Sequence, residues 1–193
     1  KLLLNKSGSA YAINSGAVSI YSGGVLQYAA GSANNNQINS ARIYLYGTSQ
    51  LDFNGATDTI GSISNIAVSG VVCDTWPVTN TAGGGNLTIT TLGITPAPGH
   101  LTTIDPGTGT ITLGGNVTFY ANLDGRAKIS GNLDLGGASR TFSVGDGYCL
   151  DDLLVDAKVT STSGAYGITK STSGSRLILS GANEYTGITY LNG

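Results

Sequence analysis

The chain has 193 residues, a formal net charge of −2, 30 glycines and only 10% charged residues. This charge gives no basic footprint for nucleic acid, and no window of about 18 apolar residues is available to cross a membrane as a helix. Recurrent Ile, Val, Leu, Thr and Tyr argue against disorder, because disordered chains are poor in β-branched and aromatic residues.

Short runs of alternating polar and apolar residues recur along the chain, and each ends at Gly, Asn or Asp. Each run predicts a strand, and each closing Gly predicts a sharp corner, because Gly tolerates positive φ. A run over 148–158 is the best candidate for a helix, but its adjacent acids and β-branched residues favour a strand with a turn. The clearest strands, in chain order, are 17–21, 42–46, 86–90, 110–113, 128–130 and 176–179.

This all-β pattern fits a sandwich, a closed barrel or a solenoid, since the strand spacing alone does not separate them. Low charge, Gly at corners, and Ser, Thr and Asn between apolar positions favour a parallel β-solenoid spanning 1–193 as one segment. With roughly 20–25 residues per coil and about 4.8 Å between stacked strands, the chain would make about eight or nine coils over roughly 40 Å.

Residues 73–106 break the pattern and predict a looped insertion in the solenoid, with a strand over 86–92 inside it. The segment holds Trp76, His100, a run of three glycines and all four prolines of the chain, and proline is unfavourable inside a ladder. Two roles stay open for it: a binding site that uses Trp76, or a proline-rich lid that shields an edge.

The two cysteines, Cys73 and Cys149, lack metal-ligand spacing. They allow either a disulfide, in an oxidising compartment, or two small buried thiols. About three coils would separate them in a solenoid, so pairing needs a loop excursion or a partner chain.

Tyr44 and Tyr46 alternate with Ile43 and Leu45, so both rings are expected on one face of their strand. Such a face either contacts a sugar ring or a neighbouring fibre, or simply reflects the preference of Tyr for half-exposed strands.

The acidic residues suit either of two chemical roles or a role in building corners. Clustered carboxylates with a nearby cation could catalyse polysaccharide cleavage, and acids beside Gly-containing turns could bind calcium. Acids close in sequence are more often turn residues, so no catalytic residue, metal or cofactor is expected. The residues concerned are Asp146, Asp151, Asp152 and Lys158 for catalysis, and Asp52, Asp124, Asp134 and Asp146 for calcium.

Three stretches carry a family resemblance. The C-terminal stretch 164–193 contains LSGANEYTG, while 48–63 contains QLDFNGATDTIGSI and 131–144 contains NLDLGGASRTFSV. These resemble the autotransporter-associated β-strand repeat, also called the passenger-associated transport repeat. The resemblance implies a right-handed parallel β-helix in a large bacterial protein that is secreted or displayed on the surface, with adhesive or matrix-building roles and no catalytic motif.

Within that family the coil after the C-terminal motif often begins with a sequence like residues 1–8 of this chain, KLLLNKSG. The chain is therefore expected to be one period of a tandem array, or one subunit of a head-to-tail fibre, whose neighbour is another copy. The residues expected at the stacked ends are Leu2, Leu3, Leu4, Ile188 and Tyr190.

Together these observations predict an extracellular, non-enzymatic structural protein that associates with itself. An adhesion module that binds glycans or other cells, through the insertion or the Tyr face, is the alternative. A polysaccharide-degrading β-helix enzyme is a second alternative.

Overall fold

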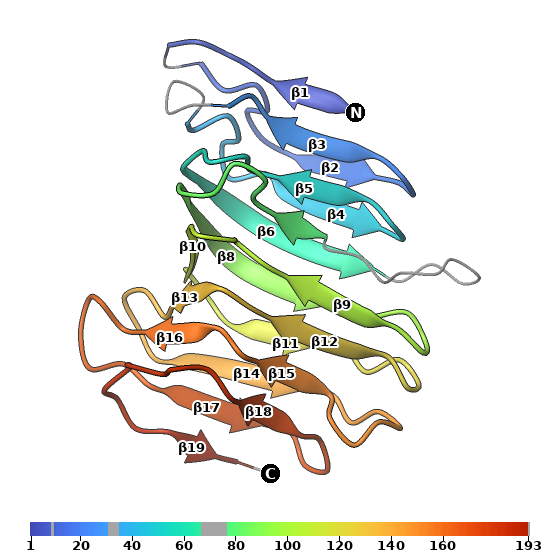
Figure 1. Cartoon of the computed structure of the whole chain (residues 1–193), viewed down its shortest axis with the longest axis vertical. Helices are drawn as coiled ribbons and strands as arrows, with labels where there is room; N and C mark the ends of the chain where they lie inside the picture. The colour runs from blue at the N-terminus through green and yellow to red at the C-terminus, as the bar shows by residue number, and fades with distance from the viewer. Residues whose placement is uncertain (9, 31–34, 67–76, 193) are drawn as a thin grey trace.

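The computed structural model describes residues 1–8, 10–30, 35–66 and 77–192, and every strand pair in that part of the chain is parallel. The chain winds as a right-handed solenoid with its termini at opposite ends of the long axis (Figure 1). The prediction of an all-β parallel solenoid is confirmed. The described part of the chain contains no helix that is long and apolar enough to span a membrane.

The coil has three faces. Face 1 is an eight-stranded sheet made of β1 (Leu2–Leu4), β3 (Val25–Tyr28), β5 (Gln50–Asp52), β7 (Val78–Thr79), β9 (Leu101–Ile104), β12 (Arg126–Ile129), β15 (Leu153–Val155) and β18 (Leu177–Leu179).

Faces 2 and 3 belong to one 11-stranded sheet, because the long strands β6 (Asp58–Ile66) and β8 (Asn86–Ile94) bend and contribute to both. Face 2 continues from their first halves through β10 (Thr110–Leu113), β13 (Asn132–Asp134) and β16 (Lys158–Thr160). Face 3 joins their second halves to β2 (Ala17–Ile20), β4 (Arg42–Tyr46), β11 (Val117–Phe119), β14 (Arg140–Val144), β17 (Ile168–Ser171) and β19 (Tyr190–Leu191).

The register places apolar residues directly above one another inside the coil. On face 1 a single column of aliphatic side chains runs from the first strand to the last, and on face 2 a second column runs from β8 to β16. Stacking of this kind excludes water from the centre, so burial of these side chains is the main source of stability. The face 1 column is Leu2, Leu26, Leu51, Val78, Ile104, Ile129, Val155 and Leu179, and the face 2 column is Leu87, Ile111, Leu133 and Val159.

Each coil is longer than the sequence suggested. Paired residues on face 1 lie between 24 positions apart (Leu2 and Leu26) and 27 positions apart (Leu51 and Val78). Eight strands on that face give seven coil-to-coil steps, so the expectation of eight or nine coils over roughly 40 Å is too high. At about 4.8 Å per step the described strands span about 34 Å. The corners between faces, which range from two residues between β12 and β13 to 13 residues between β3 and β4, are not shown by the strand pattern and account for the difference.

The segment 73–106 contributes three ordinary strands to the coils. Of its residues, 77–106 lie in the described part of the chain and include β7, β8 and β9, which pair with the coils before and after them. The prolines lie at corners, where no ladder bond is needed: Pro77 precedes β7, Pro96 and Pro98 separate β8 from β9, and Pro106 follows β9.

The stacked core leads to a stability prediction. Ile129→Ala is expected to lower the free energy of unfolding by about 2–5 kcal/mol, because it opens a cavity in the face 1 column. The measurement is urea unfolding followed by circular dichroism.

The neighbouring Lys128→Ala variant is the control, since this outward side chain makes only a part-exposed ion pair with Asp156. A loss for Lys128→Ala as large as that for Ile129→Ala would contradict the assignment of inward and outward positions.

Candidate functional site

The two ends of the solenoid expose the inner columns that every intermediate coil covers. Leu2 occupies the first position of the face 1 column and is 58% exposed, whereas its partner Leu26 is buried. At the other end Leu191 pairs with Lys170 on face 3 and is 79% exposed. Both ends therefore present apolar side chains and unpaired strand edges that a further coil would cover.

The C-terminal end is hollowed. A cavity of about 260 Å³ opens between the last strands of faces 1 and 3. Lys170 takes an inward position there, in register with the buried Phe142 of β14 on face 3, and its Nζ donates a hydrogen bond to the carbonyl oxygen of Thr172. The lining residues are Ile168, Lys170, Ser175, Arg176, Leu177, Leu179, Thr189 and Leu191.

The predicted end residues do not all point the same way. Leu2 and Leu4 lie in register with the buried Leu26 and Tyr28, so both face the core, whereas Leu3 lies in register with the outward Gln27. At the C-terminal end Tyr190 lies in register with outward Thr169, and Leu191 rather than Tyr190 takes the inward position.

Face 3 carries the predicted tyrosines on its outer side. Tyr44 and Tyr46 alternate with Ile43 and Leu45, which are fully buried, so the shared outward face is confirmed. The ring centroids of Tyr44 and Tyr46 are 6.5 Å apart. Tyr21 stacks on Tyr46 with centroids 4.9 Å apart and an interplanar angle of 11°.

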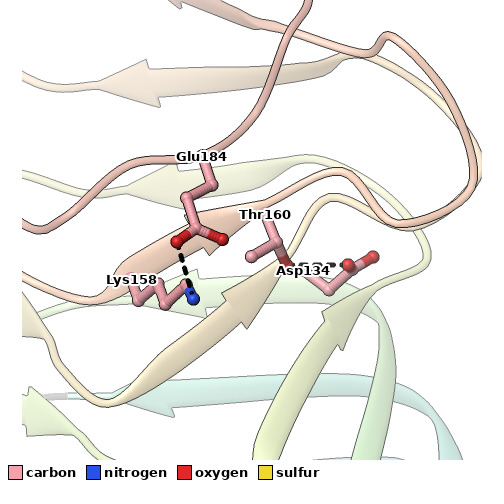
Figure 2. A network of polar contacts seen from close by, with 4 residues as sticks. All are labelled: Asp134, Lys158, Thr160 and Glu184. Atoms are coloured by element: carbon pink, nitrogen blue, oxygen red, sulfur yellow. Dashed lines mark hydrogen bonds and ion pairs between the residues drawn. The ribbon is translucent and has the colours of Figure 1, made fainter.

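Face 2 carries a polar network around Asp134 (Figure 2). The carboxylate accepts hydrogen bonds from the hydroxyls of Thr160 and Thr162, at 2.8 and 2.7 Å, and from the backbone N–H of Gly136 at 2.6 Å. Lys158, beside it, pairs with Glu184 at 2.8 Å. Burial raises the pKa of Asp134, but these hydrogen bonds outweigh it, so the pKa lies below its ordinary value.

The same bonding pattern recurs at Asp52, at the end of β5. Its carboxylate accepts from the backbone N–H of Asn54 at 2.9 Å, and from both the backbone N–H and the hydroxyl of Thr81, at 3.1 and 2.7 Å. In both cases an aspartate that follows Leu at a strand end bonds its own turn and a Thr of the next coil. Asp52 and Asp134 therefore join adjacent coils at their corners.

Arg140 is a further corner residue, which sequence reasoning did not single out. Its guanidinium is buried and donates to the carbonyl oxygens of Leu135 at 2.7 Å, Gly114 at 3.0 Å and Leu113. Gly136 is required beside it, because a Cβ there would lie 2.6 Å from the Leu113 carbonyl oxygen and 3.1 Å from Arg140 Nη2. Burial lowers the pKa of Arg140, and the charge of Asp134 opposes that shift.

A buried tyrosine–aspartate pair lies inside the N-terminal half of the coil. The Tyr28 hydroxyl donates to Asp58 Oδ2 at 2.7 Å, and the Ile38 backbone N–H donates to the same oxygen at 2.9 Å. Burial raises the pKa of Asp58, and this effect is larger than that of the hydrogen bonds, which lower the pKa by stabilising the carboxylate. Burial and the adjacent Asp58 charge also raise the pKa of Tyr28.

The residues considered for catalysis are each engaged in a different structural contact. Asp152 is buried and accepts from the backbone N–H groups of Gly147 and Arg176, both at 2.8 Å. Asp151 pairs with Arg176 at 3.1 Å, while Lys158 is engaged with Glu184. Residues 1–8, 10–30, 35–66 and 77–192 hold no group of three His, Cys, Asp or Glu side chains with metal-site geometry, so the four aspartates considered for calcium do not converge.

Two of the predicted contact residues, Trp76 and Cys73, lie outside the described residues. Cys149 lies in the corner between β14 and β15, where its thiol donates to the Asp124 carbonyl oxygen at 2.8 Å. Whether the cysteines pair thus stays a prediction.

Comparison with protein-family models, with curated proteins and with solved structures found no match to this chain. What the fold and its surfaces define is a parallel β-solenoid with open ends.

The Asp134 network predicts how stability depends on pH. A carboxyl group whose pKa is lower in the folded than in the unfolded state stabilises the fold above its unfolded pKa, and this stabilisation is lost as pH falls through the folded pKa. Asp134→Asn is expected to cost about 1–3 kcal/mol at pH 7 and to flatten the fall in stability below about pH 4. Urea midpoints measured from pH 7 to pH 2 test this.

Glu184→Gln is the control for this experiment, because its side chain is 59% exposed and its ion pair with Lys158 is a surface contact. An Asp134→Asn profile parallel to that of the unmodified chain at acid pH would contradict the assigned role.

Proposed function

We propose that this chain is a structural segment of an extracellular fibre or surface adhesin, and that it stacks end to end with identical or similar coils. The observation that carries the proposal is the face 1 column, which runs from Leu2 to Leu179 and is exposed at its N-terminal end. A neighbouring coil would bury these apolar ends and satisfy the backbone groups of both edge strands.

The two ends are complementary in direction and pattern. β1 and β18 lie on the same face, each has three residues, and each turns its first and third residues, Leu2 and Leu4 or Leu177 and Leu179, toward the core. Placing β1 of one copy on β18 of another continues a parallel ladder. Because this contact is head-to-tail, it generates a filament rather than a closed dimer.

A covalent tandem arrangement is compatible with the same geometry. If residue 193 were joined to residue 1 of a following copy, Asn192, Gly193 and Lys1 would separate β19 from the next β1. Three residues, 47–49, also separate β4 from β5 at the equivalent corner. Tandem periods of one chain and separate subunits are therefore both compatible with the proposed filament.

The proposed mechanism is mechanical and includes no catalytic step or cofactor. Continuous ladders and a dry core resist bending, and a surface with 10% charged residues is little affected by salt. The extracellular setting is inferred from the uncharged composition rich in Gly, Ser, Thr and Asn, and from the resemblance of 48–63, 131–144 and 164–193 to the autotransporter-associated repeat.

The proposal predicts filaments of the isolated chain. Sedimentation velocity over a concentration series, with electron microscopy of the same samples, is expected to show rods whose axial repeat is near the length of one chain. Leu191→Asp is expected to abolish these rods, because it places a charge in the buried contact.

Leu150→Asp is a closely matched control. Leu150 is 78% exposed and Leu191 is 79% exposed, but Leu150 lies in the corner between β14 and β15, one coil before the terminal strands β18 and β19. Monomers at every concentration, or equal effects of the two substitutions, would overturn end-to-end stacking.

A further inference from the structure

The outer side of face 3 has a groove that the stacking function does not use. It has a volume of about 450 Å³ and lies beside the tyrosine cluster described above. The lining residues are Ser40, Arg42, Tyr44, Gly61, Ser62, Ser64 and Thr91. Arg42 supplies a positive charge and Tyr44 an aromatic ring, and the other five residues are small.

The register explains why the surface is hollow here. Arg42, Ser62 and Thr91 occupy one outward column, and Tyr44, Ser64 and Gly93 occupy the next. The long side chains of β4 stand beside the short ones of β6, about 4.8 Å away. The side chains of Arg42 and Tyr44 therefore form one side of the groove, and the hydroxyl groups of Ser62, Ser64 and Thr91 line its base.

The polar groups of the groove are not used within the described part of the protein. No side-chain hydrogen bond or ion pair forms there from Arg42, the Tyr44 hydroxyl, Ser62, Ser64 or Thr91, and Arg42 is held only through its backbone, in the ladders with Ala17 and Ser62. The groove on face 2 differs, because its Asp134, Lys158, Thr160 and Thr162 bond to one another or to neighbouring coils (Figure 2). The face 3 groove therefore has donors and acceptors to offer a ligand.

The chemistry of the walls identifies the kind of ligand. An unpaired guanidinium binds a carboxylate through two parallel hydrogen bonds. A tyrosine ring packs against the apolar C–H face of a pyranose, and serine and threonine hydroxyls match sugar hydroxyls. A peptide strand fits less well, because β4, β6 and β8 are each paired on both sides and leave no backbone edge for strand addition.

We propose that this groove binds a carboxylated saccharide unit, with Arg42 on its carboxylate, Tyr44 against one ring face and Ser62 and Ser64 on its hydroxyls. Binding would be weak at a single groove, because an open surface buries little of a ligand. It would become effective by avidity, since a filament displays one such groove on every copy. The single-site interaction itself does not depend on filament formation.

The test is saturation-transfer difference NMR with a disaccharide that contains one glucuronic acid, compared with its neutral glucose counterpart. The method observes the ligand, so it works whether the chain is monomeric or polymeric. The acidic sugar is expected to bind in the millimolar range, with the strongest saturation on the C–H protons of one ring face, and the neutral sugar about tenfold more weakly.

Arg42→Gln is expected to raise the dissociation constant for the acidic sugar about tenfold and to remove the preference over the neutral sugar. Arg126→Gln is the matched control, because Arg126 is also exposed and also begins its strand, but lies on face 1. Tyr44→Ala is expected to abolish the saturation of the ring face, and Tyr148→Ala, in an 84% exposed loop position, is expected to leave it unchanged.

Three results would each overturn the proposal. They are equal binding of the acidic and neutral sugars, equal effects of Arg42→Gln and Arg126→Gln, and no saturation transfer at tens of millimolar sugar. Circular dichroism spectra identical to that of the unmodified chain ensure that a loss of binding reports on the groove and not on unfolding.

Discussion

The parallel in-register pairing of successive coils is the constraint on which the rest of this structure depends. Each residue lies about 4.8 Å above its counterpart in the previous coil, so every side chain has a neighbour at the same position of the coil. Inside, this produces an unbroken column such as Leu51, Val78, Ile104 and Ile129, in which each aliphatic group covers the next. Outside, it brings like polar groups together, as in the 3.0 Å contact between the hydroxyls of Ser143 and Ser171.

The corners transmit this register from one coil to the next. Asp52 and Asp134 each bond their own turn and a Thr in the following coil, and Arg140 holds carbonyl oxygens of two successive coils. The bonds that cross between coils join residues 26 to 29 positions apart in sequence, so a corner fixes where the next strand begins. The interior supplies stability, while the corner bonds select one register among those that an aliphatic column alone would tolerate.

Much of the fold could be predicted from sequence because its signals are local. Alternation identifies strands such as β4 and β10, and it places Ile43 inward and Tyr44 outward. Whether a side chain at the end of the solenoid points inward or outward is not determined by its local sequence. Leu3 differs from Leu2 and Leu4 only through its register with Gln27, and in a run of three leucines nothing reveals it. The coil number was overestimated for the same reason, since corner lengths depend on bonds such as those of Asp134 and Arg140.

The candidate site was predictable only in part. Alternation was sufficient to place Tyr44 on an outer face, but the groove beside it requires knowing that Ser62 and Ser64, about 20 residues later, are its neighbours. Arg140 gave no signal, because an arginine in a polar run looks like a surface residue until its three carbonyl partners are seen.

Stacking also explains the low charge of the chain. A charged residue repeated at one coil position would place like charges about 4.8 Å apart, which is destabilising, so outward columns are filled by Ser, Thr and Asn. Three ion pairs join opposite charges in adjacent coils: Lys128 with Asp156, Lys158 with Glu184, and Arg176 with Asp151.

Arg42 takes no part in such a pair: its column neighbours Ala17 and Ser62 carry no charge, and no acid in the described part of the chain forms an ion pair with it. An exposed guanidinium beside an aromatic ring, over a surface of free hydroxyl groups, is what a ligand carrying its own carboxylate would require.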